Sequence, residues 1–269
     1  MFHSLVPIQR GGDRLPFFCV HGAGGNVLNF RLLTRGMPPE QPFYGFQAYG
    51  TDGVVRPHDS IEAMADAYLS ELRQAQPHGP YLLGGYSGGG VVAFEMAQRL
   101  GAEGEPVSLL ALIDTYQPQL KPRAITFGTR WARLRREGLH YVAGAVRTRR
   151  ELFRQAGAYA ALDRHLDREE PIPLPLRDLH LTRSFREAAC RYRPRPWRGR
   201  ATLFRASDGE EFFEDLTPGN GWEPFLEGGV EVVPIPGAHL TVLLGANGQA
   251  LGPLLLASIQ RAQHDGLQG

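Results

Sequence analysis

Residues 81–100 read YLLGGYSGGGVVAFEMAQRL, and this stretch decides the fold. An apolar run, YLLGG, leads into GYSGG at 85–89, which matches the pattern G-x-S-x-G. The apolar sequence that follows predicts a helix over 91–100. Between a strand and a helix, this pattern holds a serine hydroxyl on a sharp turn at the carboxyl edge of a sheet. We therefore predict that Ser87 is a nucleophile.

The glycine-rich turn has two other interpretations, a purely structural turn and a phosphate-binding loop. A P-loop would require Gly-Lys-Ser/Thr, which does not follow this turn. A dinucleotide fingerprint, G-x-G-x-x-G, would put Tyr86 and Ser87 where a glycine must approach the pyrophosphate. The strand–turn–helix setting therefore favours the catalytic interpretation.

Short apolar runs alternate with helical patterns through the first 115 residues and again after residue 199. Ser60 caps a helix in which apolar residues recur from Ile61 to Leu72 with helical spacing, on one face. Strands alternating with helices indicate βαβ units and a mainly parallel sheet flanked by helices. The predicted strands cover 15–20, 42–47, 81–86, 107–113, 201–206 and 230–235, and a final helix runs from about 248 to 264.

Residues 116–198 interrupt this rhythm and contain no convincing strand. Prolines at 171, 173 and 175 separate their helical patterns, which lie near 126–136, 139–161 and 178–192. Because structureless loops of this length are rare, we predict one α/β domain with a helical insertion. The predicted parts are a first core segment over 1–115, the insertion over 116–198 and a second core segment over 199–269.

The segment HGAGG at 21–25 directly follows the apolar run LPFFCV. In an α/β-hydrolase, the loop after this strand provides one backbone N–H of the oxyanion hole, and the residue after the nucleophile provides the other. By position, these donors are Ala23 and Gly88. Removing one such donor typically costs about 3–4 kcal/mol of transition-state stabilisation. His21 precedes the nucleophile in the chain and is predicted to be a structural loop residue.

His239 lies in PIPGAH, just after the strand predicted over 230–235. A histidine there can accept the Ser87 proton and return it to the leaving group or the incoming nucleophile. Asp114 ends the apolar run VSLLALID, and Asp208 follows the run ATLFRAS. Either carboxylate could orient the histidine, and the chain order Ser…Asp…His holds for both. Asp114 is favoured because it closes a fully apolar run, whereas Asp208 opens an acidic cluster.

Composition and charge exclude several classes of protein. Hydrophobic residues make up 42% of the 269, too many for a disordered chain. The 29 basic and 28 acidic residues argue against a general nucleic-acid binder. No apolar run is long enough to predict a membrane span, and the N-terminus lacks a secretory pattern. Cys19 and Cys190 form neither a disulfide framework nor a metal-type spacing, so a cytoplasmic protein without a metal site is expected.

The sequence resembles the thioesterase domains that end nonribosomal peptide and polyketide synthetases. The resemblance covers essentially the whole chain and includes LVPIQRGG, FFCVHGAGGNVLNF, GGYSGGGVVAFEMAQRL, LLALIDT and PGAHL. It implies an α/β-hydrolase fold in which the insertion forms a helical lid over an acyl channel. In such integral domains the acid follows the strand after the nucleophile's helix, which favours Asp114. In stand-alone editing relatives it follows the next strand, which would be Asp208.

The resemblance also implies acyl transfer in two steps. An acyl chain arrives as a thioester on the phosphopantetheine arm of a carrier protein domain, the expected partner. Ser87 attacks it, with His239 as base and Asp114 orienting the base, and water or an internal hydroxyl or amine then releases the chain by hydrolysis or macrocyclisation. No metal or organic cofactor is expected.

Other functions stay open from the sequence: a discrete editing (type II) thioesterase, a general esterase or lipase, and a non-catalytic binding module. The insertion adds a question about charge, because residues 121–200 hold 20 basic and 8 acidic side chains. These arginines could simply pair with an acidic body. Alternatively, they could steer an acidic carrier domain, and the candidates for this are Arg133, Arg135, Arg136, Arg147, Arg149 and Arg150.

Overall fold

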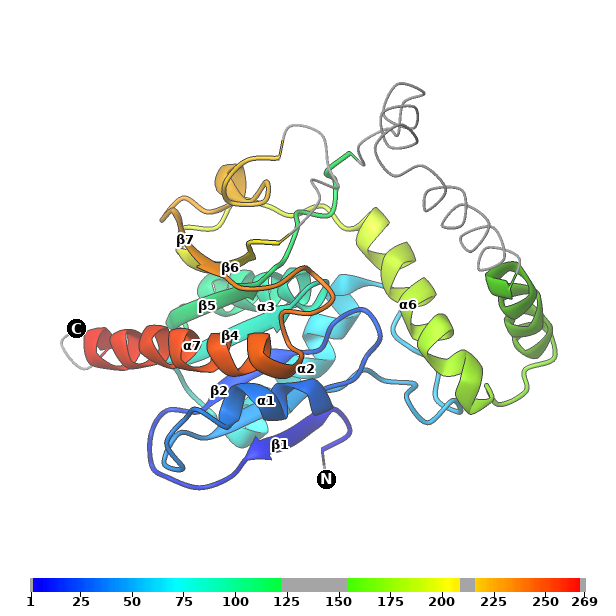
Figure 1. Ribbon diagram of the computed structural model, residues 1–269, viewed down its shortest axis with the longest axis horizontal. Coiled ribbons are helices and arrows are strands. Elements are labelled where there is room, and N and C mark those ends of the chain that lie inside the picture. Colours follow the sequence, from blue (N-terminus) through cyan, green and yellow to red (C-terminus); the bar gives the residue numbers. More distant parts are fainter. Residues whose placement is uncertain (1, 122–153, 209–215, 267–269) are drawn as a thin grey trace.

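The computed structural model describes residues 2–121, 154–208 and 216–266 (Figure 1). Seven strands form one sheet in the order β1-β3-β2-β4-β5-β6-β7. Only β1 runs antiparallel to its neighbour, and the other five pairings are parallel. The predicted mainly parallel sheet is therefore confirmed. The strands are β1 (Leu5–Gln9), β2 (Phe17–Val20), β3 (Phe43–Phe46), β4 (Tyr81–Tyr86), β5 (Val107–Ile113), β6 (Ala201–Ala206) and β7 (Val230–Ile235).

Helices cover both faces of the sheet, α1 and α7 on one side and α2 and α3 on the other (Figure 1). Each face has its own buried apolar cluster, so the sheet is the middle layer of three. None of the described helices is both long and apolar enough to cross a membrane. The helices are α1 (Arg31–Thr34), α2 (Ile61–Ala75), α3 (Gly89–Ala102), α6 (Leu174–Arg191) and α7 (Gly245–Gly266), with 3₁₀ turns η1 (Leu28–Phe30) and η2 (Glu223–Phe225).

The helix α2 forms where the capping signal and the apolar spacing predicted it. The Ser60 hydroxyl oxygen accepts a hydrogen bond from the Ala63 N–H at 3.2 Å, which satisfies one of the free donors of the first turn. The predicted apolar face, from Ile61 to Leu72, is buried. The helix α3 is buried on nearly all sides, because it lies under the central strands β4 and β5.

The strand β1 was not predicted from the sequence. Its side chains do not alternate between buried and exposed. Pro7 has no N–H to donate to β3, and the pairing with β3 shifts by one residue between Pro7 and Gln9. Proline is tolerated there because β1 is the edge of the sheet, where one side of the backbone needs no partner.

Helices make up most of the described part of the insertion: a helical segment over 154–167 and then α6. The helix α6 begins at Leu174, four residues earlier than predicted, because a proline is well tolerated in the first turn of a helix. The predicted helical stretch 126–136, most of the stretch 139–161 and the six arginines from 133 to 150 lie outside the described residues. The proposed boundaries of the insertion stay a prediction.

Candidate active site

Ser87 lies on the turn between β4 and α3 with a φ of 53°, in the left-handed region that non-glycine residues rarely adopt. Its N–H donates to the Ile113 carbonyl of β5 at 2.8 Å, which fixes the turn against the sheet. A Cβ atom on Gly85 would lie 2.3 Å from the carbonyl carbon of Gly89. The turn is therefore so tight that the first glycine of the motif has no room for a side chain.

Three of the predicted residues form one chain of contacts. The Ser87 Oγ lies 2.9 Å from His239 Nε2, and His239 Nδ1 lies 2.7 Å from Asp114 Oδ2. Asp114 is fully buried, and its other oxygen accepts the Ala206 N–H at 3.0 Å. A carboxylate beside Nδ1 favours the tautomer that carries its proton there, so Nε2 is left to accept the serine proton. This arrangement can activate a hydroxyl for attack on a carbonyl carbon.

Asp208, the other candidate acid, occupies a different place. It is exposed, its Oδ2 accepts the Gly237 N–H at 3.2 Å, and its own N–H donates to the Gly237 carbonyl at 3.0 Å. These bonds support the loop that carries His239 and do not reach the imidazole ring. The geometry therefore favours Asp114 as the group that orients His239.

The two predicted oxyanion donors lie on neighbouring segments, Ala23 after β2 and Gly88 at the start of α3. A Cβ atom on Gly89 would lie 2.0 Å from the His21 carbonyl oxygen, so the glycine lets α3 approach the loop after β2. Neither the Ala23 nor the Gly88 N–H donates a hydrogen bond to another described residue. Backbone N–H groups of this kind, beside the positive end of a helix, are the donors that an oxyanion hole uses, and their role here stays a prediction.

The helix α6 packs onto both of these segments. A Cβ atom on Gly88 would lie 2.3 Å from the Phe185 ring, and one on Gly25 would lie 3.0 Å from a methyl carbon of Leu181. Leu181 and Phe185 are four residues apart and buried, on one face of α6. Sequence reasoning missed them, although the apolar spacing of α6 was a signal that this face is covered.

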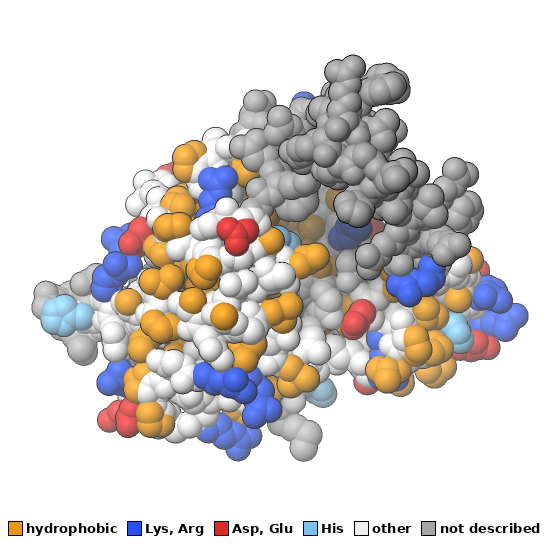
Figure 2. All heavy atoms as spheres, viewed as in Figure 1, with side chains coloured by type: hydrophobic (Ala, Val, Ile, Leu, Met, Phe, Trp, Pro, Cys, Tyr) orange, Lys and Arg blue, Asp and Glu red, His pale blue; other side chains and the backbone are white. Residues whose placement is uncertain are grey.

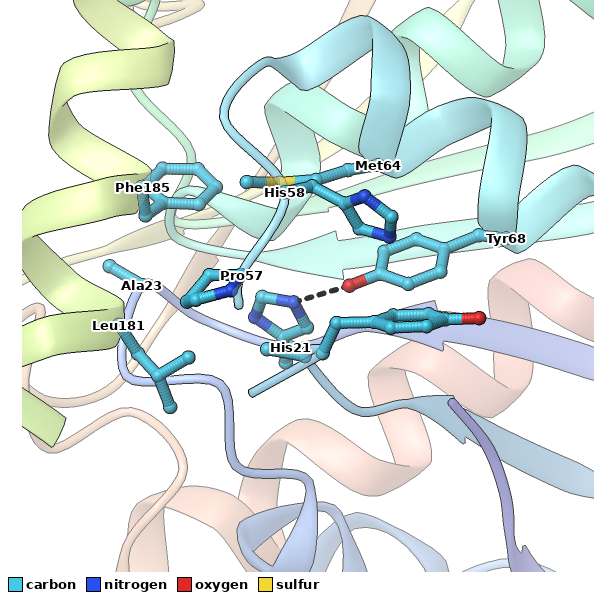
Figure 3. Close-up of a pocket in the computed structure, with 10 residues that line it drawn as sticks. His21, Ala23, Pro57, His58, Met64, Tyr68, Leu181 and Phe185 are labelled. Carbon is cyan, nitrogen blue, oxygen red and sulfur yellow. Dashed lines mark hydrogen bonds between the residues drawn. The ribbon is translucent and has the colours of Figure 1, made fainter. Parts of the chain in front are cut away.

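His21 lies in a small cavity under α6, beside Ala23 (Figure 3). Its Nε2 lies 2.8 Å from the Tyr68 hydroxyl, and its Nδ1 faces the Gly22 carbonyl at 2.5 Å. Burial lowers the pKa of His21 to about 4, so the ring is neutral at pH 7. These contacts fit the prediction of a structural role for His21.

We expect His21 to make the folded state less stable as the pH falls from 6.5 to 4. In that window the unfolded chain binds a proton on this histidine and the folded chain does not, so unfolding is favoured by up to about 3 kcal/mol. The free energy of urea unfolding at pH 7 and pH 4.5 measures this loss. His21→Gln should show a smaller loss than the wild type. The control His3→Gln, at an exposed histidine, should behave like the wild type, and equal losses in all three proteins would contradict the expectation.

A family model described as the thioesterase domain matches residues 15–251 of the chain. A dimodular nonribosomal peptide synthase of Bacillus subtilis (strain 168) is 30% identical over 249 residues, which cover 87% of this chain and 10% of that synthase. The chain thus spans only a small part of this relative, and 4% or less of two other relatives.

Two solved structures have the same fold. The NocB thioesterase domain from the nocardicin cluster aligns with a TM-score of 0.63 and 22% identity, over 99% of each chain. The type II thioesterase BorB from the borrelidin biosynthetic cluster aligns with a TM-score of 0.65 and 20% identity, over 95% of this chain and 97% of that one. The predicted α/β-hydrolase fold is confirmed.

Proposed function

Because the chain belongs to the thioesterase domain family, we propose that it releases an acyl chain from a carrier-bound thioester through an acyl-Ser87 ester. The observation that carries this proposal is the line of contacts from Ser87 Oγ through His239 to the buried Asp114 carboxylate. This line supplies a nucleophile, a base and an orienting acid within hydrogen-bond distance of one another.

In the first step, the Ser87 oxygen attacks the thioester carbonyl carbon while its proton moves to His239 Nε2. Asp114 stabilises the resulting imidazolium through Nδ1–H. The carbonyl oxygen becomes an oxyanion that accepts hydrogen bonds from the Ala23 and Gly88 N–H groups. When the carbonyl reforms, the C–S bond breaks and the thiolate takes the proton from His239, which leaves an ester on Ser87.

In the second step, His239 removes a proton from the incoming nucleophile, which attacks the ester carbonyl carbon. The C–O bond to Ser87 breaks, and the serine oxygen recovers a proton from His239. Water gives a free acid, whereas a hydroxyl or amine of the same acyl chain gives a macrocycle. Apart from the thioester and the attacking water, hydroxyl or amine, both steps as written use only protein groups, and no step calls for a metal or organic cofactor.

The proposed partner is a carrier protein domain whose phosphopantetheine arm presents the thioester. The relatives support this proposal, because one of them is a nonribosomal peptide synthase. The insertion, residues 116–198, is proposed as a lid over the acyl chain. Its described helix α6 supports this, since it lies against Gly88, one residue from the nucleophile.

A substrate comparison tests the proposed function. Acyl chains are offered as phosphopantetheine thioesters and as matched oxygen esters, and intact-protein mass spectrometry records the acyl adduct. We expect faster turnover of the thioesters and an adduct that maps to Ser87. Faster turnover of the oxygen esters would indicate a general esterase, and an adduct on another residue would overturn the mechanism.

A further inference from the structure

Tyr86 occupies the variable position of the G-x-S-x-G motif, directly before Ser87. It is the last residue of β4, so its backbone belongs to the strand that positions the nucleophile. The mechanism above gives it no role. Its side chain nevertheless contacts the loop that carries the base.

The Tyr86 hydroxyl donates a hydrogen bond to the backbone carbonyl of His239 at 2.7 Å. The two rings also stack, with centroids 5.8 Å apart and an angle of 24° between their planes. Burial and the nearby Asp114 raise the pKa of Tyr86 to about 12, so the hydroxyl keeps its proton at neutral pH. The bond therefore ties the main chain of the base to the strand of the nucleophile.

The other side of the Tyr86 ring meets the loop after β2. A Cβ atom on Gly22 would lie 2.9 Å from the Tyr86 ring, so a glycine is needed there for the ring to fit. Ala23, the proposed oxyanion donor, is the next residue. The ring is thus in contact with the nucleophile strand, the oxyanion loop and the base.

The loop of His239 lies at the margin of the sheet. It follows β7, which lies at the edge of the sheet and has a strand on one side only. Leu240, next to the base, is 79% exposed. Figure 2 shows other hydrophobic side chains spread over one face of the molecule. The loop is also held by hydrogen bonds of Asp208 to Gly237, of Thr241 to Ala238 and of Asn247 to Thr241. The imidazole itself contacts Asp114 and the Tyr116 ring. The Tyr86 bond differs from these contacts, because it fixes the main chain of the base directly to the strand that carries Ser87.

We propose that Tyr86 is a positioning residue: its hydroxyl holds the backbone of His239 so that Nε2 stays within hydrogen-bond distance of the Ser87 hydroxyl. The proposal rests on the proposed function, since it assigns Tyr86 a part in activating Ser87. Tyr86 acts through His239 and does not itself exchange a proton with the substrate.

Tyr86→Phe keeps the ring and removes only the donor. Tyr81→Phe is a matched control, because Tyr81 begins the same strand and its hydroxyl also donates to backbone carbonyls, those of Gln76 and Pro77, both at 3.2 Å. Each protein reacts with a fluorophosphonate, which phosphonylates the activated serine, and the maximal rate and the half-saturating concentration are measured separately. Thermal unfolding of each variant measures the cost to stability.

We expect Tyr86→Phe to lower the maximal rate of phosphonylation about tenfold with an unchanged half-saturating concentration. Tyr81→Phe should keep the wild-type rate, although both variants lose a buried hydrogen bond and some thermal stability. 4-Aminophenylalanine at position 86 restores a donor and should restore the rate. Equal rates in Tyr86→Phe and Tyr81→Phe would overturn the positioning role.

Two further outcomes keep the test decisive. If Tyr86→Phe does not fold, 4-fluorophenylalanine at position 86 takes its place, because fluorine fills the space of the hydroxyl without donating, and the same loss of rate is expected. If the wild type is not phosphonylated at Ser87, the proposed function fails and the role of Tyr86 fails with it. A labelled wild type with an unaffected Tyr86→Phe variant would leave the proposed function standing and reject the positioning role alone.

Discussion

Ser87→Ala is expected to lower turnover of an acyl thioester by roughly 10⁵- to 10⁶-fold, because no other group can form the ester intermediate. The oxyanion donors and the bound geometry survive, so a small rate above the uncatalysed reaction should remain. Steady-state kinetics with a phosphopantetheine thioester measure the loss. Intact-protein mass spectrometry should show no acyl adduct on the variant.

The control for this substitution is Ser70→Ala, at an exposed serine of α2. It should keep wild-type turnover. Ser87→Ala should unfold near the wild-type temperature, since alanine and serine are similarly strained at the positive φ of this turn. Residual turnover above one per cent in Ser87→Ala would show that another residue, or water directly, attacks the thioester.

Asp114→Asn is expected to lower kcat about 10⁴-fold, the second largest effect. The amide can donate to Nδ1, which moves the imidazole proton to Nε2, and a protonated Nε2 cannot accept the proton of Ser87. Asp208→Asn is the matched variant, because its amide oxygen can still accept the Gly237 N–H. We expect Asp208→Asn to lose less than tenfold.

The two aspartate variants also distinguish the two possible places of the acid, Asp114 as in integral thioesterase domains and Asp208 as in stand-alone editing relatives. Steady-state kcat and thermal unfolding are measured for both, so that a loss of folded protein is not read as a loss of chemistry. A large loss in Asp208→Asn with near wild-type activity in Asp114→Asn would place the acid after β6. That result would contradict the contact seen between Asp114 and His239.

The place of Ser87 on a turn between a strand and a helix was predictable because its signal is local. A strand, a tight turn and a helix occupy twenty consecutive residues, and each has its own sequence pattern. The position of His239 after the strand 230–235 was also predictable, and the contact of its ring with Ser87 is seen in the structure. The sequence could not decide which of Asp114 and Asp208 contacts the histidine. The two residues follow β5 and β6, which are parallel neighbours whose ends meet at the same edge of the sheet. Only the three-dimensional positions show that Asp114 lies beside the imidazole.

Other contacts were beyond sequence reasoning for a different physical reason. The role of Tyr86 depends on a loop 153 residues away, and no local pattern carries that pairing. The strand β1 lacked alternation because half-buried edge residues follow no strict period. The spacing of apolar residues predicted helices in the insertion. It could not show that Phe185 contacts Gly88, because such spacing shows which face of a helix is buried but not what covers it.

The contact between Phe185 and Gly88 links the evolution of two distant parts of the chain. A Cβ atom at position 88 would lie 2.3 Å from the ring at position 185, so that ring would have to move aside or be replaced by a smaller side chain. Among relatives, residue sizes at these two positions should therefore vary inversely. A chimera that grafts a foreign insertion onto this core must choose the residue at position 185 to suit Gly88, because the Phe185 ring fills the space that a side chain at position 88 would need.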